Sequence, residues 1–125
     1  MQIDIDTGDS NTNRIVSYSK NCIELKNKLI KNTLVISSTR LDETMLCANF
    51  NDFDLENLKK IISWEPEIIL IGSGKTAYLP NPEWIIYANK KNIGLEVMTT
   101  GAACRSYNLL VDEGRNAVAC LFLPA

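Results

Sequence analysis

The feature that most constrains the fold is Ile68-Ile69-Leu70-Ile71, an apolar run without polar alternation. Such a run is typical of a central strand that is covered on both faces. Two helix–strand repeats follow it, with helices that begin near residues 81 and 99 and strands at residues 95–98 and 117–121. Strands that alternate with helices favour parallel pairing through right-handed crossovers. We therefore predict an α/β fold with a β-α-β-α-β unit in the C-terminal half.

Short β-like runs separated by turn residues fill residues 14–50, and β-branched side chains alternate with polar ones in several of them. We predict an antiparallel β meander there, as an N-terminal extension to an α/β core at residues 54–125. Residues 1–13 are polar and lack a periodic pattern, so we expect them to be flexible. The whole length of 125 residues suits a single domain.

Charge and hydropathy exclude several function classes. The net charge of -2 gives no basic surplus, so we expect no nucleic-acid partner. The longest apolar run is far too short to cross a bilayer, and the first residues lack a basic segment followed by an apolar one. We expect a cytoplasmic protein that is not an integral membrane protein.

The inventory of reactive side chains is short. The chain has no histidine, and its four cysteines are far apart with no C-x-x-C pair. This composition argues against a zinc site and removes the usual Ser-His and Cys-His catalytic pairs. We expect no metal and no cofactor, and any catalysis would rely on Cys, Arg, Lys, Tyr or carboxylates.

The turn after the apolar run, Gly72-Ser73-Gly74-Lys75-Thr76, resembles part of a phosphate-binding loop. That motif, G-x-x-x-x-G-K-[ST], needs a glycine where this chain has Ile69, and it leads directly into a helix. Here Pro80 comes before any helix can form. The simpler interpretation is a turn whose glycines let the backbone bend and a neighbouring element approach closely.

A second turn, Thr99-Thr100-Gly101, leads into a helix that carries Cys104, Arg105 and Asn108. Free N–H groups and the helix dipole could bind an anion near Thr100, Gly101 and Arg105. The same field and Arg105 could lower the pKa of Cys104 and make it a nucleophile, whereas a cysteine that only packs in the core is the more common case. Arg105 could equally form a surface ion pair, and Asn108 could share a pocket with Cys104 or simply face solvent.

Both glycine turns follow the carboxyl ends of predicted strands, where open α/β sheets bind their ligands. If the two strands are neighbours, Gly72, Ser73 and Gly74 line a common crevice with the segment from Thr100 to Arg105. Adjacency of the strands is the condition that this hypothesis requires.

The sequence Gly94 to Asn108, which contains the stretch TGAACR-x-YN, together with the GSG turn and Glu113-Gly114-Arg115, resembles a known family. This is the family of small α/β proteins related to mitochondrial complex I assembly factor 3. The resemblance is close in the C-terminal half and only general in the N-terminal half. It implies a three-layer α/β/α fold with a mixed central sheet, and a prokaryotic member whose function is unassigned.

Two hypotheses of function follow. In the first, which the resemblance implies, the chain is a non-enzymatic interaction protein that binds a protein partner and aids assembly of a respiratory or other membrane-associated complex. In the second, it is a protein or enzyme that binds a small anion in the crevice around Thr100 to Arg105, with Cys104 as the candidate nucleophile.

Overall fold

A computed structural model describes residues 12–125 of the chain. Its strands and helices follow the order β2 (Ile15–Tyr18), β3 (Ile23–Leu25), β4 (Lys28–Ile30), β5 (Leu34–Ile36), β6 (Leu41–Asp42), a 3-10 turn η1 (Phe50–Asp52), α2 (Leu55–Ile62), β7 (Ile68–Gly72), α3 (Pro82–Asn89), β8 (Gly94–Met98), α4 (Thr100–Asp112) and β9 (Ala117–Leu121). The residues that we expected to be flexible, 1–13, lie outside the described part except for residues 12 and 13.

The central sheet has five strands in the order β6-β5-β9-β7-β8. β7 pairs in parallel with both β8 and β9, whereas β5 pairs antiparallel with β9 and with β6. The predicted mixed sheet is therefore confirmed, as is the β-α-β-α-β unit that builds its parallel part. The apolar run at residues 68–71 lies inside the sheet, between β9 and β8.

The prediction of one meander over residues 14–50 is only partly right. β2, β3 and β4 do form a separate three-stranded antiparallel sheet. β5 instead joins the central sheet, and all three of its residues are buried. A strand whose residues are all buried is more stable in the middle of a layered fold than in an extension at the surface.

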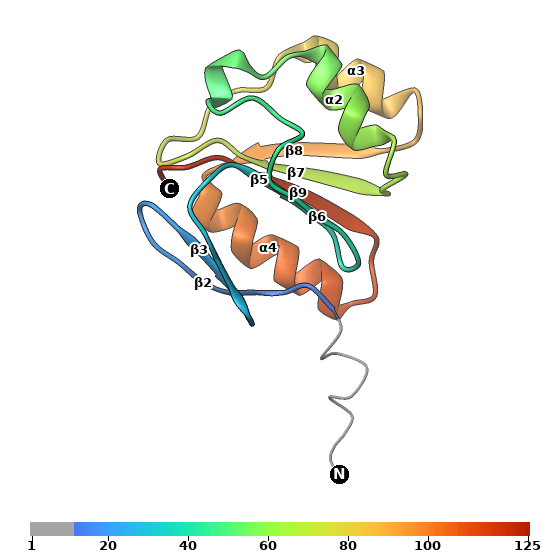
Figure 1. Cartoon of the computed structure of the whole chain (residues 1–125). Helices are drawn as coiled ribbons and strands as arrows, with labels where there is room; N and C mark the ends of the chain where they lie inside the picture. The colour runs from blue at the N-terminus through green and yellow to red at the C-terminus, as the bar shows by residue number, and fades with distance from the viewer. Residues whose placement is uncertain (1–11) are drawn as a thin grey trace.

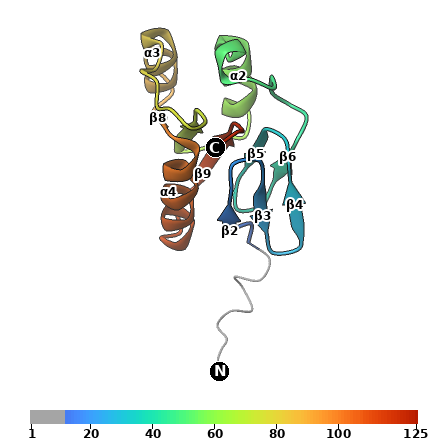
Figure 2. The same cartoon turned by 90° about the vertical axis from the view of Figure 1, so that its left-hand side faces the viewer.

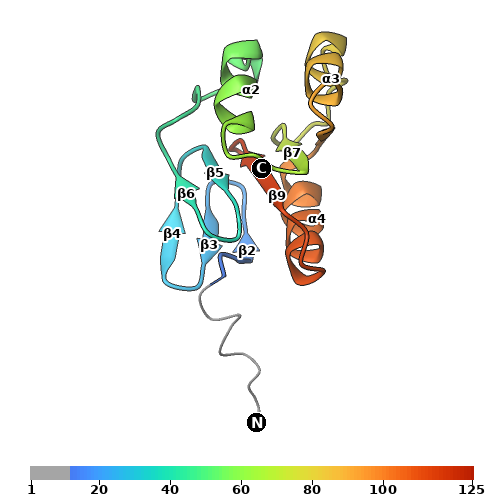
Figure 3. The ribbon, with the colours of Figure 1, turned by 90° about the vertical axis from the view of Figure 1, so that its right-hand side faces the viewer.

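The molecule has three layers, which Figure 1 shows from the side of the sheet. α2 and α3 cover one face of the central sheet, and α4 covers the other face together with the three-stranded sheet. Figures 2 and 3 show from two opposite sides that β2 runs beside α4. The predicted α/β/α layering is confirmed, with the small sheet sharing a layer with α4.

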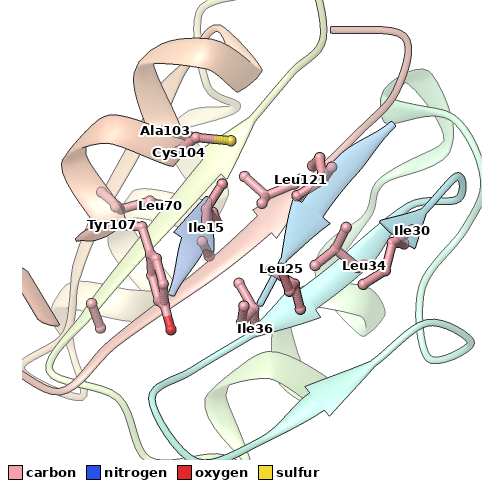
Figure 4. Packing of buried hydrophobic residues seen from close by; sticks show 13 residues of the cluster. Ile15, Leu25, Ile30, Leu34, Ile36, Leu70, Ala103, Cys104, Tyr107 and Leu121 are labelled. Atoms are coloured by element: carbon pink, nitrogen blue, oxygen red, sulfur yellow. The ribbon is translucent and has the colours of Figure 1, made fainter. Parts of the chain in front are cut away.

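Each face of the central sheet contributes to its own apolar core. The first core joins α4 and the three-stranded sheet to the central sheet through residues that include Ile15, Ile30, Leu70, Tyr107 and Leu121. Figure 4 shows this cluster from close by. The second core packs α2 and α3 on the other face; its buried members are Val35, Phe53, Leu58, Ile61, Ile69, Ile71, Trp84, Ala88, Ile93, Val118, Cys120 and Phe122.

Local sequence signals set the helix ends. Asp54 and Asn57 form a reciprocal capping box at the start of α2, and the Asn81 side chain accepts a hydrogen bond from the Glu83 N–H at the start of α3. Thr99 caps α4 by accepting a hydrogen bond from the Ala102 N–H. These caps satisfy N–H groups that the first helical turns leave free.

No helix within residues 12–125 is both long and apolar enough to cross a membrane.

Gly72 ends β7 where α4 approaches most closely. A Cβ atom on Gly72 would lie 2.7 Å from the Thr100 Cα, whereas one on Gly94 would have no neighbour closer than the Ile68 side chain, at 3.6 Å, which is an ordinary van der Waals contact. We expect Gly72→Ala to lower the free energy of unfolding by about 1–3 kcal/mol, because the backbone of α4 has to move. Gly94→Ala is the matched control and should change it by less than about 1 kcal/mol. Urea denaturation of both variants tests this, and equal effects would contradict it.

Candidate functional site

The two glycine turns meet at the carboxyl ends of β7 and β8, which are neighbours, as the crevice hypothesis required. The Ser73 N–H donates to the Met98 carbonyl oxygen over 2.8 Å. The Ser73 hydroxyl lies 2.7 Å from the Thr76 carbonyl oxygen and 3.1 Å from that of Met98. The turns are therefore joined directly by hydrogen bonds, and a ligand-binding crevice between them stays a prediction.

Thr100 is the centre of this junction and is fully buried. Its hydroxyl donates to the Phe122 carbonyl oxygen over 2.6 Å and accepts from the Gly74 N–H over 2.9 Å. Its own N–H donates to the Gly74 carbonyl oxygen. A single side chain thus links the first turn of α4, the turn after β7 and the segment after β9.

Replacing Thr100 tests this linking role. We expect Thr100→Val to cost about 1–3 kcal/mol of stability, because a buried N–H and a buried carbonyl oxygen each lose a partner while the size of the side chain is kept. Thr100→Ser retains the hydroxyl and should cost less. Thermal or urea denaturation compares the two, and a valine variant as stable as the serine variant would contradict the role.

The first turn of α4, where we predicted an anion, is covered by Tyr18 of β2. A Cβ atom on Gly101 would lie within 2.9 Å of three atoms of the Tyr18 side chain. The exposed Arg105 guanidinium donates a hydrogen bond to the Tyr18 hydroxyl oxygen. Tyr18 therefore lies where an incoming ligand would approach these residues, and their anion-binding role stays a prediction.

Asn108 anchors β2 to the side of α4. Its Oδ1 accepts from the Ile15 N–H over 2.9 Å, and its Nδ2 donates to the Ile15 carbonyl oxygen over 2.8 Å. The amide thus imitates the pair of hydrogen bonds that a neighbouring strand would make. Tyr107 adds a hydrogen bond to the Asn13 carbonyl oxygen, and Arg14 forms an ion pair with Asp112. These contacts fix the N-terminal segment on α4.

Cys104 points into the first core and is 1% exposed. Figure 4 shows it on the side of α4 that faces the strands, near Tyr107. Burial raises the pKa of the Cys104 thiol to about 12, against the smaller opposing effect of Arg105. The thiol is therefore neutral near neutral pH, and packing accounts for this residue. Its role as a nucleophile stays a prediction without support from its surroundings.

Thiol labelling tests the state of Cys104. Because its pKa is raised to about 12, we expect almost no thiolate and almost no labelling at pH 8, whereas the half-buried Cys22 should react readily. Because folding raises the pKa of this thiol above its ordinary value, its contribution to the free energy of unfolding is fully present below about pH 9 and is lost as the pH rises further. Mass spectrometry of labelled peptides gives the measurement. Equal labelling rates for Cys104 and Cys22 would contradict it.

An open hollow of about 470 Å³ lies on the outer side of the first glycine turn, at the carboxyl ends of β7 and β9. Its lining residues are Asn49, Phe50, Asn51, Asp52, Ser73, Gly74, Lys75, Thr76, Tyr78, Phe122, Leu123 and Pro124. Ser73 and Gly74 are the predicted site residues among them. Gly72, Thr100, Gly101, Cys104, Arg105 and Asn108 do not line it.

The aromatic wall of this hollow was not predicted from the sequence. The rings of Phe50 and Tyr78 stack with their centroids 5.5 Å apart. Both residues belong to segments without helical or strand periodicity, so no pattern marked them. Apolar aromatic residues inside otherwise polar loops were the available signal.

Within residues 12–125 no group of His, Cys, Asp or Glu side chains could hold a metal ion.

Comparison with known proteins identifies the family. Residues 15–122 match the family described as protein of unknown function DUF498/DUF598. The chain belongs to this family.

Two named relatives match part of the chain. Over 75 residues the chain is 40% identical to a 13 kDa major membrane protein of Francisella tularensis, a match that covers 56% of this chain and 60% of that protein. Over 78 residues it is 31% identical to NADH dehydrogenase [ubiquinone] 1 alpha subcomplex assembly factor 3 of Xenopus tropicalis, which covers 61% of this chain and 43% of the relative. The matched region therefore spans less than two thirds of either relative.

Solved structures share the fold. A protein from Bordetella parapertussis superimposes with a TM-score of 0.83 and 26% identity, over 90% of this chain and 96% of the other. A Mth938-like domain from Bordetella pertussis gives a TM-score of 0.82 with 21% identity, over 100% of this chain and 94% of the other. The chain thus has the Mth938-like α/β fold.

Proposed function

We propose that the chain acts by binding a protein partner, as a non-enzymatic assembly factor for a respiratory or other membrane-associated complex. The observation that carries this proposal is that side chains predicted to do chemistry are bonded or buried within the fold. Thr100 and Asn108 bond to the backbone of their own chain, and Cys104 is buried with a raised pKa. These groups stabilise the fold, so binding through the surface is the simpler activity.

The names of the relatives supply the kind of partner. One relative is an assembly factor for NADH dehydrogenase, and another is named a membrane protein. Assembly of a respiratory complex on a membrane combines the two descriptions. This step rests on family likeness, since fold alone does not fix function.

The surface that suits a partner best is the side of the molecule formed by β8 and α3. β8 is the last strand of the central sheet and pairs only with β7 among the described residues. An edge strand offers free N–H and carbonyl groups that an extended segment can pair with. α3 lies against β8 and exposes Ile86, which is 56% accessible.

Glu96 favours a different protein over a second copy at this edge. It is the middle residue of β8 and is exposed. Antiparallel pairing of two β8 strands centred on Glu96 would bring two carboxylates face to face, which is unfavourable. We therefore assign the edge to an extended segment of another protein, with a basic residue opposite Glu96.

A complementation experiment tests the proposal. In a strain that lacks the protein, we expect less assembled respiratory complex on native gels. Wild-type protein should restore it, whereas Glu96→Lys should bind the partner about tenfold less and fail to restore it, because the reversed charge repels the basic residue. Glu24→Lys, an exposed reversal on β3, is the matched control and should restore assembly. Unchanged membrane complexes in the deletion strain would refute the assembly role.

A further inference from the structure

A projecting apolar residue lies next to the hollow at the carboxyl ends of β7 and β9. Leu79 is 94% exposed, which makes it the most exposed large apolar side chain of the described residues. Its neighbour Tyr78 is 49% exposed and forms one wall of the hollow, where its ring stacks on Phe50. This stacking and Pro80 restrict the segment, so Leu79 projects from a supported base rather than from a free loop.

The hollow has apolar walls and a charged rim. Phe50, Phe122, Leu123 and Pro124 supply the apolar part of its lining. Lys75 and Asp52 also line it, and neither belongs to the ion pairs found among residues 12–125. Its volume of about 470 Å³ is within the range of sites that enclose small molecules, and is ample for an apolar side chain.

We propose that this end of the molecule is a self-association surface, on which a second copy of the chain docks. Two copies pack about a two-fold axis, and each inserts Leu79 into the hollow of the other. Lys75 of each copy then faces Asp52 of the second copy. The proposal is independent of the assembly role. That role uses the free edge of β8 and a basic partner residue opposite Glu96, whereas self-association uses the hollow at the carboxyl ends of β7 and β9.

The geometry favours a second copy because one patch carries both halves of the contact. A two-fold interface uses the same patch on both molecules, so a projection beside a hollow is used twice. The rim carries one positive and one negative group, and the same rotation pairs them twice without placing like charges together. A partner with only basic or only acidic groups would attract one of Lys75 and Asp52 and repel the other.

The expected affinity is modest. Burying Leu79 is worth roughly 1.5–3 kcal/mol for each copy. The patch is small compared with standard stable interfaces, so we expect dissociation in the micromolar range rather than a permanent dimer. The dimer should also weaken as salt screens the two rim pairs.

Sedimentation equilibrium over a concentration series from about 1 µM to about 1 mM, which brackets the affinities of small interfaces, tests the proposal. We expect a monomer–dimer equilibrium in the wild type. Leu79→Asp should weaken dimerisation at least about tenfold, since a charge replaces the buried anchor. Because Leu79 is almost fully exposed, this variant should fold normally. Leu109→Asp, an equally drastic change at an exposed leucine of α4, is the matched control and should dimerise as the wild type does.

A charge exchange makes the test specific. Lys75→Glu and Asp52→Lys should each weaken the dimer, and the double variant should restore it, because the pair is then present with its signs reversed. A wild type that stays monomeric, a Leu79→Asp dimer of unchanged affinity, or a double variant that fails to recover would overturn the proposal.

The other occupants of this patch have distinct outcomes. A monomeric wild type whose Leu79→Asp variant loses the respiratory partner would assign the hollow to that partner and overturn self-association. Binding of monomeric protein to vesicles of phosphatidylcholine and phosphatidylglycerol, lost in Leu79→Asp, would assign Leu79 to a lipid surface and also overturn it. Failure to dimerise with partner binding unchanged would overturn only this inference and leave the proposed function in place.

Discussion

The rest of the structure depends on how Thr100 closes the carboxyl end of the central sheet. β7 and β9 pair in parallel, and the segments that leave them would separate unless something held them. The Thr100 hydroxyl bonds to one segment at the Gly74 N–H and to the other at the Phe122 carbonyl oxygen. The absence of a side chain at Gly72 lets the backbone of α4 approach closely enough for both bonds. The sheet end is therefore closed by polar groups that are all paired, which is the condition for burying them.

The position of α4 then determines the N-terminal half. Asn108 presents both halves of its amide to Ile15, so α4 replaces a strand along the free edge of β2. Burial of Ile23, Ile30 and other apolar residues of the small sheet against the central sheet supplies the larger stabilisation. The Asn108 bonds add direction to this packing, because they fix which residue of β2 lies beside which turn of α4. Asn108, with the contacts of Tyr107 and Arg105, thus sets the position of the small sheet on α4.

The sequence predicted the parallel part of the sheet, since uninterrupted apolar strands and capped helices alternate there at regular spacing. The adjacency of β7 and β8 was only a condition of the crevice hypothesis, and the structure meets it. The sequence did not predict the position of β5, because three apolar residues fit an edge, a meander or a central strand equally well. The roles of Asn108 and Tyr18 were also hidden, since their partners Ile15 and Arg105 are 93 and 87 positions away. Local periodicity carries no information about such distant pairs.

The candidate site illustrates the same limit in its chemistry. Small residues, a cysteine and an arginine at a helix start fit an anion site, and they equally fit a helix that has to pack closely against a turn. The close approach of the backbones at Thr100 and Gly72 favours the packing role there, since a Cβ atom on Gly72 would lie 2.7 Å from the Thr100 Cα. The open space lies on the outer side of the same turn, where Phe50 and Tyr78 stack. Close packing inside the sheet end therefore places the accessible apolar surface at its rim, at Leu79 and the hollow, and exposed apolar patches of this kind serve as binding surfaces.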